Sequence, residues 1–312
     1  MASITDQRHL TSPNRLTAGI FMAVAGACLW GLSGTAAQYL FEHTAVTPGW
    51  LVTIRMAVSG VLILAYGAIT QGVRPMETLW KTRDWRALIV FALVGLLGVQ
   101  YSYLAAIQSG NAASATLLQY LGPSLVTLWV AVKTRQWPRR RQIVAVTCTL
   151  FGTWLVVSNG HFALLSVPPL AVFWGLLSAV TLAFYSLFPS PLLKRWGAVS
   201  VVGWGMLVGS LASGLRWTPW HIVQWPHSLL AWTLLGFVVV GGTTVAFLLY
   251  LMSLSRLSAS TASVLTSAEP LVATVAAMVW LHVHLHPLQD VGAAMIIAGV
   301  IILALRPETH IE

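Results

Sequence analysis

Ten long apolar stretches follow one another along the chain, separated by short polar links, and this pattern constrains the fold more than any other feature of the sequence. A helix that crosses a bilayer needs roughly 20 apolar residues. The backbone must satisfy its own hydrogen bonds in lipid, and the stretches lack the polar alternation of barrel strands. The sequence therefore predicts an all-α integral membrane protein with ten transmembrane helices. The predicted spans are 16–40, 48–69, 87–107, 112–132, 143–158, 168–188, 199–215, 229–251, 258–281 and 288–305.

The composition excludes several classes of protein. Only 8% of residues are charged, whereas soluble domains carry about 25%. The net charge of +9 resides in the short links, so we expect no nucleic-acid partner. Cys28 and Cys148 both lie within apolar stretches, which disfavours a disulfide framework or a paired-cysteine metal site. Neither a Walker loop nor a dinucleotide-binding glycine motif is present, so we expect no cofactor.

The positive charges are distributed unevenly over the links between the stretches. If the N-terminus is cytoplasmic, every Lys and Arg except Arg55 and Arg216 falls in an inner segment. Cytoplasmic loops of membrane proteins carry an excess of Lys and Arg, so this bias predicts the orientation and favours an even number of spans. We therefore expect a multi-pass protein of the inner (plasma) membrane with both termini cytoplasmic.

The two halves of the chain are weakly similar to each other. We expect two units, residues 1–158 and 159–312, of five spans each. Because five is an odd number, the units insert in opposite directions, and the basic link after the fourth span corresponds to an outer link without Lys or Arg. Inverted repeats place a substrate site near the bilayer midplane, between the units. A shift of 147 residues pairs Tyr103 with Tyr250, Pro123 with Pro270, Gln142 with Gln289, and Gly152 with Gly299.

Several motifs carry a family resemblance. They are the run Leu-Trp-Gly-Leu-Ser at 29–33, Arg55, Pro123, the pair Glu269-Pro270 and the small-residue run 292–300. With them, nearly the whole chain resembles the EamA-type members of the drug/metabolite transporter superfamily, and among these it looks like the YddG-like exporters of aromatic amino acids. The resemblance implies a secondary transporter that exports small amphipathic metabolites, with aromatic amino acids favoured, by alternating access. The Gly-Glu that often follows each proline-containing span in the family is absent here, so no role of that Glu carries over.

Polar and aromatic residues within the spans are the candidates for a central cavity, because such groups are costly in contact with lipid. Arg55 is the one Lys or Arg inside a span. It either attracts an anionic substrate group, or snorkels to the outer surface or pairs with backbone carbonyls. Glu269 is a carboxylate deep inside a span. One interpretation is that its carboxylate couples transport to substrate or proton binding. The other is that it is protonated and bonds to the backbone group that Pro270 leaves free. The cavity candidates are Trp30, Ser33, Arg55, Tyr101, Tyr103, Gln119, Tyr185, Tyr250, Ser267 and Glu269.

Pro123 and Pro270 occupy equivalent places in the two predicted repeats. A proline removes one helical hydrogen bond and bends the helix. The two positions are therefore candidate hinges for alternating access, and the alternative is a static kink that shapes the cavity.

Two other functions are alternatives to the transport of amphipathic metabolites. An exchanger of phosphorylated or sugar-type metabolites would need more cavity cations than Arg55. A lipid-modifying membrane enzyme would need clustered acids or histidines at a membrane face, and residues 282–290 are the nearest approach to such a cluster. The histidines among them, His282, His284 and His286, would meet at a metal only in an extended loop. We therefore expect no metal and no catalysis; the expected partners are a small-molecule substrate and the lipid bilayer, and the sequence leaves the oligomeric state open.

Overall fold

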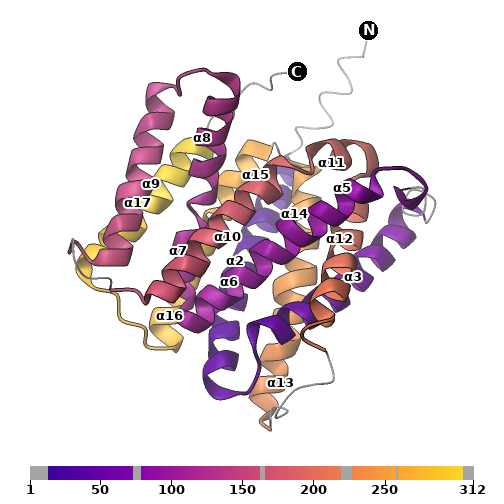
Figure 1. The fold of residues 1–312 in the computed structure, drawn as a ribbon, viewed down its shortest axis with the longest axis horizontal. Helices are drawn as coiled ribbons and strands as arrows, with labels where there is room; N and C mark the ends of the chain where they lie inside the picture. Colours follow the sequence, from indigo (N-terminus) through magenta and orange to yellow (C-terminus); the bar gives the residue numbers. More distant parts are fainter. Residues whose placement is uncertain (1–12, 73–78, 162–165, 219–226, 258, 305–312) are drawn as a thin grey trace.

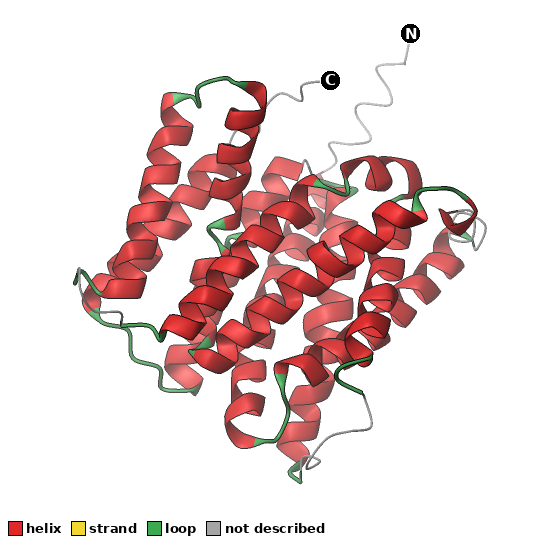
Figure 2. Cartoon of the chain, viewed as in Figure 1, coloured by secondary structure: helices red, strands yellow, loops and turns green. Residues whose placement is uncertain are grey.

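The computed structural model describes residues 13–72, 79–161, 166–218, 227–257 and 259–304, and the regular structure in these ranges is helical (Figures 1 and 2). The first half contains α2 (Pro13–His43), α3 (Pro48–Gln71), α5 (Trp85–Val90), η1 (Phe91–Leu97), α6 (Gly98–Ser109), α7 (Ala112–Gln119), α8 (Gly122–Thr134) and α9 (Arg140–Ser158). The second half contains α10 (Pro169–Leu187), α11 (Ser190–Trp196), α12 (Ala198–Gly214), α13 (Leu229–Gly236), η2 (Phe237–Val245), α14 (Ala246–Leu254), α15 (Ala259–Thr266), α16 (Ala268–Trp280) and α17 (Pro287–Ala304).

Seven helices or helical runs in the described ranges are long and apolar enough to cross a membrane, and they coincide with the first six predicted spans and the eighth. An eighth crossing results if α11 and α12, which are bent by 118° at Gly197, form one span. The remaining two predicted spans contain the shorter apolar helices α16 and α17. The structure therefore confirms an all-helical, multi-pass protein, whereas the number of ten spans stays a prediction.

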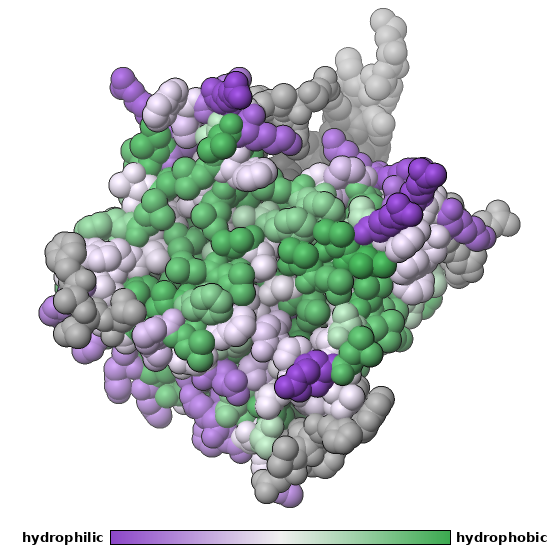
Figure 3. Space-filling view, in the orientation of Figure 1, coloured by the Kyte–Doolittle hydropathy of each residue, from purple (hydrophilic) through white to green (hydrophobic). Residues whose placement is uncertain are grey.

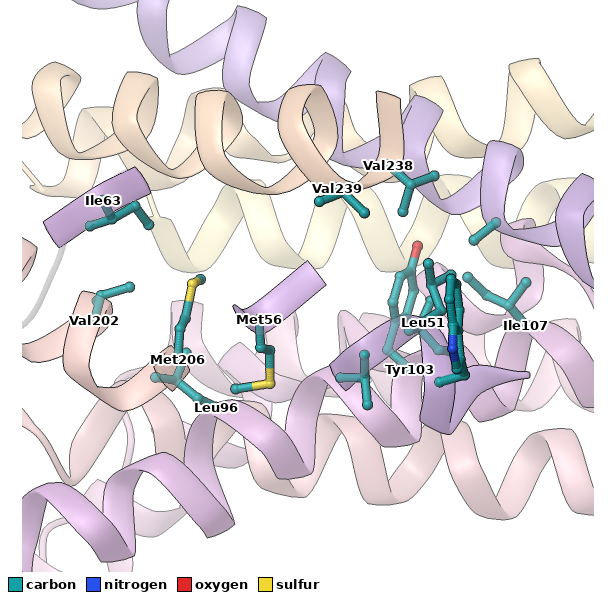
Figure 4. Close-up of a cluster of buried hydrophobic side chains, with 14 of the residues drawn as sticks. Leu51, Met56, Ile63, Leu96, Tyr103, Ile107, Val202, Met206, Val238 and Val239 are labelled. Atoms are coloured by element: carbon teal, nitrogen blue, oxygen red, sulfur yellow. The ribbon is translucent and has the colours of Figure 1, made fainter. Parts of the chain in front are cut away.

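The surface has the composition expected of a protein embedded in lipid. Large apolar side chains such as Phe21, Leu211 and Val132 are 72–74% exposed. Figure 3 shows hydrophobic residues across the middle of the visible face and hydrophilic residues at its edges. Inside, a core cluster draws on α3, η1, α6, α12 and η2, and thus on both halves of the chain (Figure 4). Hydrophobic side chains therefore face outward and inward alike, as in a helix bundle surrounded by lipid.

Four helical irregularities interrupt the spans. Two are π-helical segments, η1 and η2, in which an extra residue is inserted in the helical turn. The other two are breaks, one between α7 and α8 at residues 120–121 and one between α15 and α16 at Ser267. Pro123 and Pro270 lie directly after these breaks, in the first turns of α8 and α16. The structure thus places an interruption of the helix beside each proline, and a bend or a hinge there stays a prediction.

Side chains cap several helices where the links between them are short. Thr47 accepts a hydrogen bond from the Trp50 amide (3.3 Å) at the start of α3. Asn111 accepts one from the Ser114 amide (2.8 Å) at the start of α7. Ser228 accepts one from the Ala231 amide (3.1 Å) at the start of α13. Each side chain satisfies a donor that the first turn of a helix leaves free.

Close packing between the halves depends on small residues. α9 packs along α17, and the two lie side by side in Figure 1. A Cβ on Gly152 would lie 2.6 Å from the Gly292 carbonyl oxygen, and a Cβ on Gly299 would lie 2.7 Å from the Ala145 carbonyl oxygen. The glycines of the run 292–300 therefore allow backbone contact with α9, as small residues do in membrane interfaces. Ala294 and Ala298 in the same run are exposed and lie outside this interface.

The other helices also pair across the halves. α3 packs on α12, α10 on α6, α7 and α8, and α2 on α14, α15 and α16. Gly31 marks the tightest approach of α2 to α16, since a Cβ there would lie 2.7 Å from the Glu269 carbonyl oxygen. These pairings surround the polar side chains that α3, α6, α7 and α16 carry toward one another.

Candidate functional site

Arg55 lies in the interior of the helix bundle, two turns from the start of α3. Its side chain is 7% exposed, and its Nε has no hydrogen-bond partner among the described residues. A guanidinium that snorkelled to the surface would be exposed to solvent at its tip. The snorkelling interpretation of Arg55 therefore does not fit this geometry. A buried, incompletely paired cation of this kind is costly in a membrane protein and is typical of a functional position.

Glu269 lies in the first turn of α16, just after the break at Ser267, and its carboxylate has a partner from the other half of the chain. The Tyr120 hydroxyl lies 3.1 Å from Glu269 Oε2, to which it donates a hydrogen bond, and 2.7 Å from the Thr266 carbonyl oxygen. Tyr120 occupies the break between α7 and α8. One phenol thus connects the two helix breaks, and it holds the carboxylate at the contact between the halves.

Arg55 and Glu269 are near neighbours that do not form an ion pair. Arg55 lies within electrostatic range of Glu269 and of Tyr103. In the described part of the chain the ion pair is Arg195–Asp84 (2.9 Å), at a different place. Tyr103 is itself fixed by a 2.9 Å hydrogen bond between its hydroxyl and Thr116 Oγ1. Among the described residues, the interior therefore contains the Arg55 cation and the Glu269 carboxylate, which come from different halves and form no ion pair with each other.

Aromatic rings adjoin this polar group. The Trp30 ring packs edge-on against Phe247 (5.2 Å between centroids) and at a tilt against Tyr250 (5.5 Å). Tyr250 lies in the vicinity of Tyr120 and of Tyr185. The Tyr185 ring stacks on Phe91 of η1 at 5.4 Å. The predicted residues Trp30, Tyr185 and Tyr250 therefore belong to one neighbourhood, together with Tyr103 and Glu269.

Other predicted cavity residues have different surroundings. Tyr101 stacks on Trp217 (4.9 Å) and meets Trp174 edge-on (5.5 Å), in a separate aromatic cluster. Gln119 is buried and donates a hydrogen bond from Nε2 to Ser178 Oγ (2.7 Å), which joins α7 to α10. Ser33 lies against Gly242 of η2, and a Cβ on that glycine would overlap the serine side chain. These contacts account for Gln119 and Ser33 as packing residues, and their roles in a cavity, like that of the buried Ser267, stay predictions.

Two residues of the neighbourhood were not among the predicted cavity residues. Tyr120 follows the predicted Gln119 in the sequence, and its shared depth with Glu269 is the signal that points to it. Gln100 is 5% exposed, and neither its Nε2 nor its Oε1 has a partner among the described residues. A buried amide inside a predicted span was the signal for Gln100.

The remaining features of the described ranges lie apart from this neighbourhood. His282, His284 and His286 are exposed, and the described residues contain no group of three potential metal ligands. A cleft of about 330 Å³ is bordered by α9 and α10 and is lined by Trp154, Val157, His161 and Leu176, among others. None of the predicted cavity residues lines this cleft.

The fold and the buried polar group define a multi-pass membrane protein with an interior site, and comparisons with known proteins identify its family. The model of the EamA-like transporter family matches residues 17–158 and 169–305. The inner membrane transporter YicL of Salmonella typhimurium is 32% identical over 290 residues, which cover 92% of this chain and 95% of YicL. The threonine/homoserine exporter RhtA of Escherichia coli is 25% identical over 302 residues, 94% of each chain. A crystal structure with 20% identity has the same fold, with a TM-score of 0.63 over 94% of this chain and 96% of the other.

The chain therefore belongs to the EamA-like transporter family, and it is a multi-pass membrane transporter.

Proposed function

We propose that this transporter exports amino acids, which it binds as zwitterions between two inverted repeats. The observation that carries the proposal is the pair Arg55 and Glu269, opposite charges that interact without forming an ion pair. An amino acid presents a carboxylate and an ammonium group on one carbon atom. Arg55 is suited to the carboxylate, because its guanidinium donates several hydrogen bonds in a fixed plane. Glu269 is suited to the ammonium group.

The surroundings favour a small amphipathic solute over a highly charged one. Trp30, Phe247 and Tyr250 offer ring surfaces next to the charged pair. A stacked aromatic pair contributes about 0.5–1.5 kcal/mol, so aromatic amino acids are our first choice of substrate. RhtA is named a threonine/homoserine exporter, which makes small hydroxylated amino acids the second choice. A phosphorylated metabolite would require further cations near Arg55.

Structural correspondences support the inverted repeat at the same shift of 147 residues. The Arg139 amide donates to Gln142 Oε1 (2.8 Å) at the start of α9, and the His286 amide donates to Gln289 Oε1 (3.0 Å) at the start of α17. Arg135 ends α8 in the left-handed region with φ 52°, and His282 has the same φ just after α16. The two helix breaks and the two π-helical segments correspond as well. The two halves thus share these backbone features at equivalent positions, although few of the side chains at equivalent positions are identical.

Alternating access follows from this architecture as part of the proposal. The site lies where one broken helix from each half meets the other, at Tyr120 and Glu269. Rocking one repeat against the other about the two breaks would open the site to either side in turn. We retain the charge-based orientation, with ten spans and both termini in the cytoplasm.

The proposal is tested by flux in proteoliposomes. The purified protein should exchange labelled phenylalanine, tyrosine or threonine against unlabelled amino acid. Arg55→Gln and Glu269→Gln should each lower the exchange by at least about tenfold, because each removes a charged hydrogen-bond partner of the substrate. Arg216→Gln, at an exposed outer position, is the control. Wild-type exchange rates in both interior variants, with normal insertion, would overturn the assignment of these residues.

A further inference from the structure

Gln100 is a buried amide whose hydrogen-bonding capacity is unused. Its side chain is 5% exposed, and both of its polar atoms lack a partner in the described part of the chain. The large majority of buried side-chain polar atoms in proteins are hydrogen-bonded, so an amide with two unused atoms requires an explanation. Gln119, a buried glutamine on the neighbouring α7, is by contrast bonded to Ser178. Other buried side chains of the described residues also have an unpaired polar atom, but among these side chains Gln100 is the one with two.

The position of Gln100 in α6 brings it to the site. It precedes Tyr103 by three residues, and residues at this spacing share one face of a helix. Tyr103 lies within electrostatic range of both Arg55 and Glu269. By the shift of 147 residues, Gln100 corresponds to Phe247 of the second half, whose ring packs on Trp30. The helical spacing puts Gln100 on the face of α6 that carries Tyr103, and thus on the side of the proposed amino-acid site.

The chemistry of the amide defines the ligand group that it would bind. Nε2 only donates and Oε1 only accepts, so the complementary group both accepts and donates. A hydroxyl group does this with a single oxygen. The nearby cation, Arg55, also has an unused donor at Nε, on a helix that packs against α6. A substrate with a carboxylate and a side-chain hydroxyl would satisfy both residues.

We propose that Gln100 contacts the substrate side chain and selects amino acids that carry a hydroxyl group. This inference rests on the proposed amino-acid transport and adds the group that distinguishes one amino acid from another. The competing explanation is a buried water molecule that bonds to Gln100 and has no part in selection. The two explanations differ in whether the substrate preference changes when the amide is removed.

The test uses two pairs of amino acids that differ by a hydroxyl group, threonine against valine and tyrosine against phenylalanine. Counterflow of each labelled amino acid is measured in proteoliposomes for the wild type and for Gln100→Leu. The wild type should prefer the hydroxylated member of at least one pair, and Gln100→Leu should reduce that preference in kcat/KM by about tenfold. Gln108→Leu, the same change at an exposed position of α6, should keep the wild-type preference. Gln100→Met serves as a second apolar variant if Gln100→Leu does not insert.

Each outcome has a separate meaning. An unchanged preference in an inserted Gln100 variant, or a wild type without any preference for the hydroxyl, overturns the role of Gln100. A variant that gains thermal stability but keeps its preference supports the water molecule and likewise overturns the inference. If the wild type exchanges none of the four amino acids, the proposed function itself fails, and this result is distinguishable because it precedes any comparison of variants.

Discussion

The Tyr120 hydroxyl offers the sharpest single-atom test of the contact between the halves. Tyr120→Phe removes one proton donor that lies 2.7 Å from the Thr266 carbonyl oxygen and 3.1 Å from Glu269 Oε2. Because a hydroxyl has one proton, it donates to only one of these two oxygens at a time, and the substitution removes one hydrogen bond. A bond to a neutral acceptor contributes about 0.5–1.5 kcal/mol, and one to a charged acceptor about 1.5–3 kcal/mol. We therefore expect the free energy of unfolding to fall by about 1–3 kcal/mol.

The same change should weaken substrate binding. Without the phenol, Glu269 loses the group that orients its carboxylate, and ordering it then opposes binding. A loss of about 1.4 kcal/mol corresponds to a tenfold increase in Kd. Thermal unfolding in detergent and the KM for amino-acid counterflow measure the two effects on the same preparation. Tyr66→Phe, which removes a hydroxyl from a partly buried tyrosine of α3, is the matched control. If Tyr120→Phe matches the wild type in both Tm and KM, the hydroxyl does not hold Glu269, and the link between the two helix breaks is refuted.

Three further predictions concern packing, surface charge and topology. In a denaturation assay, Gly31→Ala should lower the free energy of unfolding by about 1–3 kcal/mol, because its Cβ would lie 2.7 Å from a backbone oxygen of α16. Gly236→Ala, where a Cβ meets nothing within 4 Å, should not destabilise the protein in that assay. Asp84→Asn removes the ion pair with Arg195, yet it should cost less than about 1 kcal/mol in that assay, because the Arg195 side chain is 61% exposed; a larger loss would give the pair a structural role that exposed pairs lack. In a cysteine-free background, cysteines at positions 6 and 309 should react with an impermeant maleimide only from the cytoplasmic side, and labelling from the outside would contradict the charge-based orientation.

Hydrophobic length and charge made the helical fold predictable from the sequence. Apolar runs of about 20 residues require helices in lipid, and the structure contains helices in all of the predicted stretches. The π-helical segments were not predictable, because an extra residue in a helical turn leaves no periodic pattern over seven or nine residues. Gly95 and Gly242, paired by the repeat, lie in these segments and were their faint signal. The breaks before Pro123 and Pro270 followed more directly from the loss of a backbone donor.

The candidate site was predictable in its charges and less so in its details. Arg55 and Glu269 stand out within apolar spans, because a charge there is costly unless it is paired or faces a cavity. The choice between Tyr101 and Tyr103 could not be made from depth alone. Two residues apart on a helix, they point about 160° apart. In the structure the Tyr103 hydroxyl bonds to Thr116, within electrostatic range of Glu269, whereas Tyr101 stacks on Trp217. At Tyr120 the break in the helix changes the direction of the side chain, which no helical pattern predicts.

The central claim is that Arg55 and Glu269 together recognise the two charges of an amino acid. The most direct measurement compares three unlabelled competitors for labelled threonine or phenylalanine counterflow in proteoliposomes: the amino acid itself, its analogue without the carboxylate and its analogue without the ammonium group. The account predicts that the amino acid competes fully, and that each analogue loses at least about tenfold in apparent affinity, because each leaves one buried charge without its partner. If either analogue competes as well as the amino acid, the site does not recognise both charges of the zwitterion. That result would contradict the proposed pairing of Arg55 with the carboxylate and of Glu269 with the ammonium group.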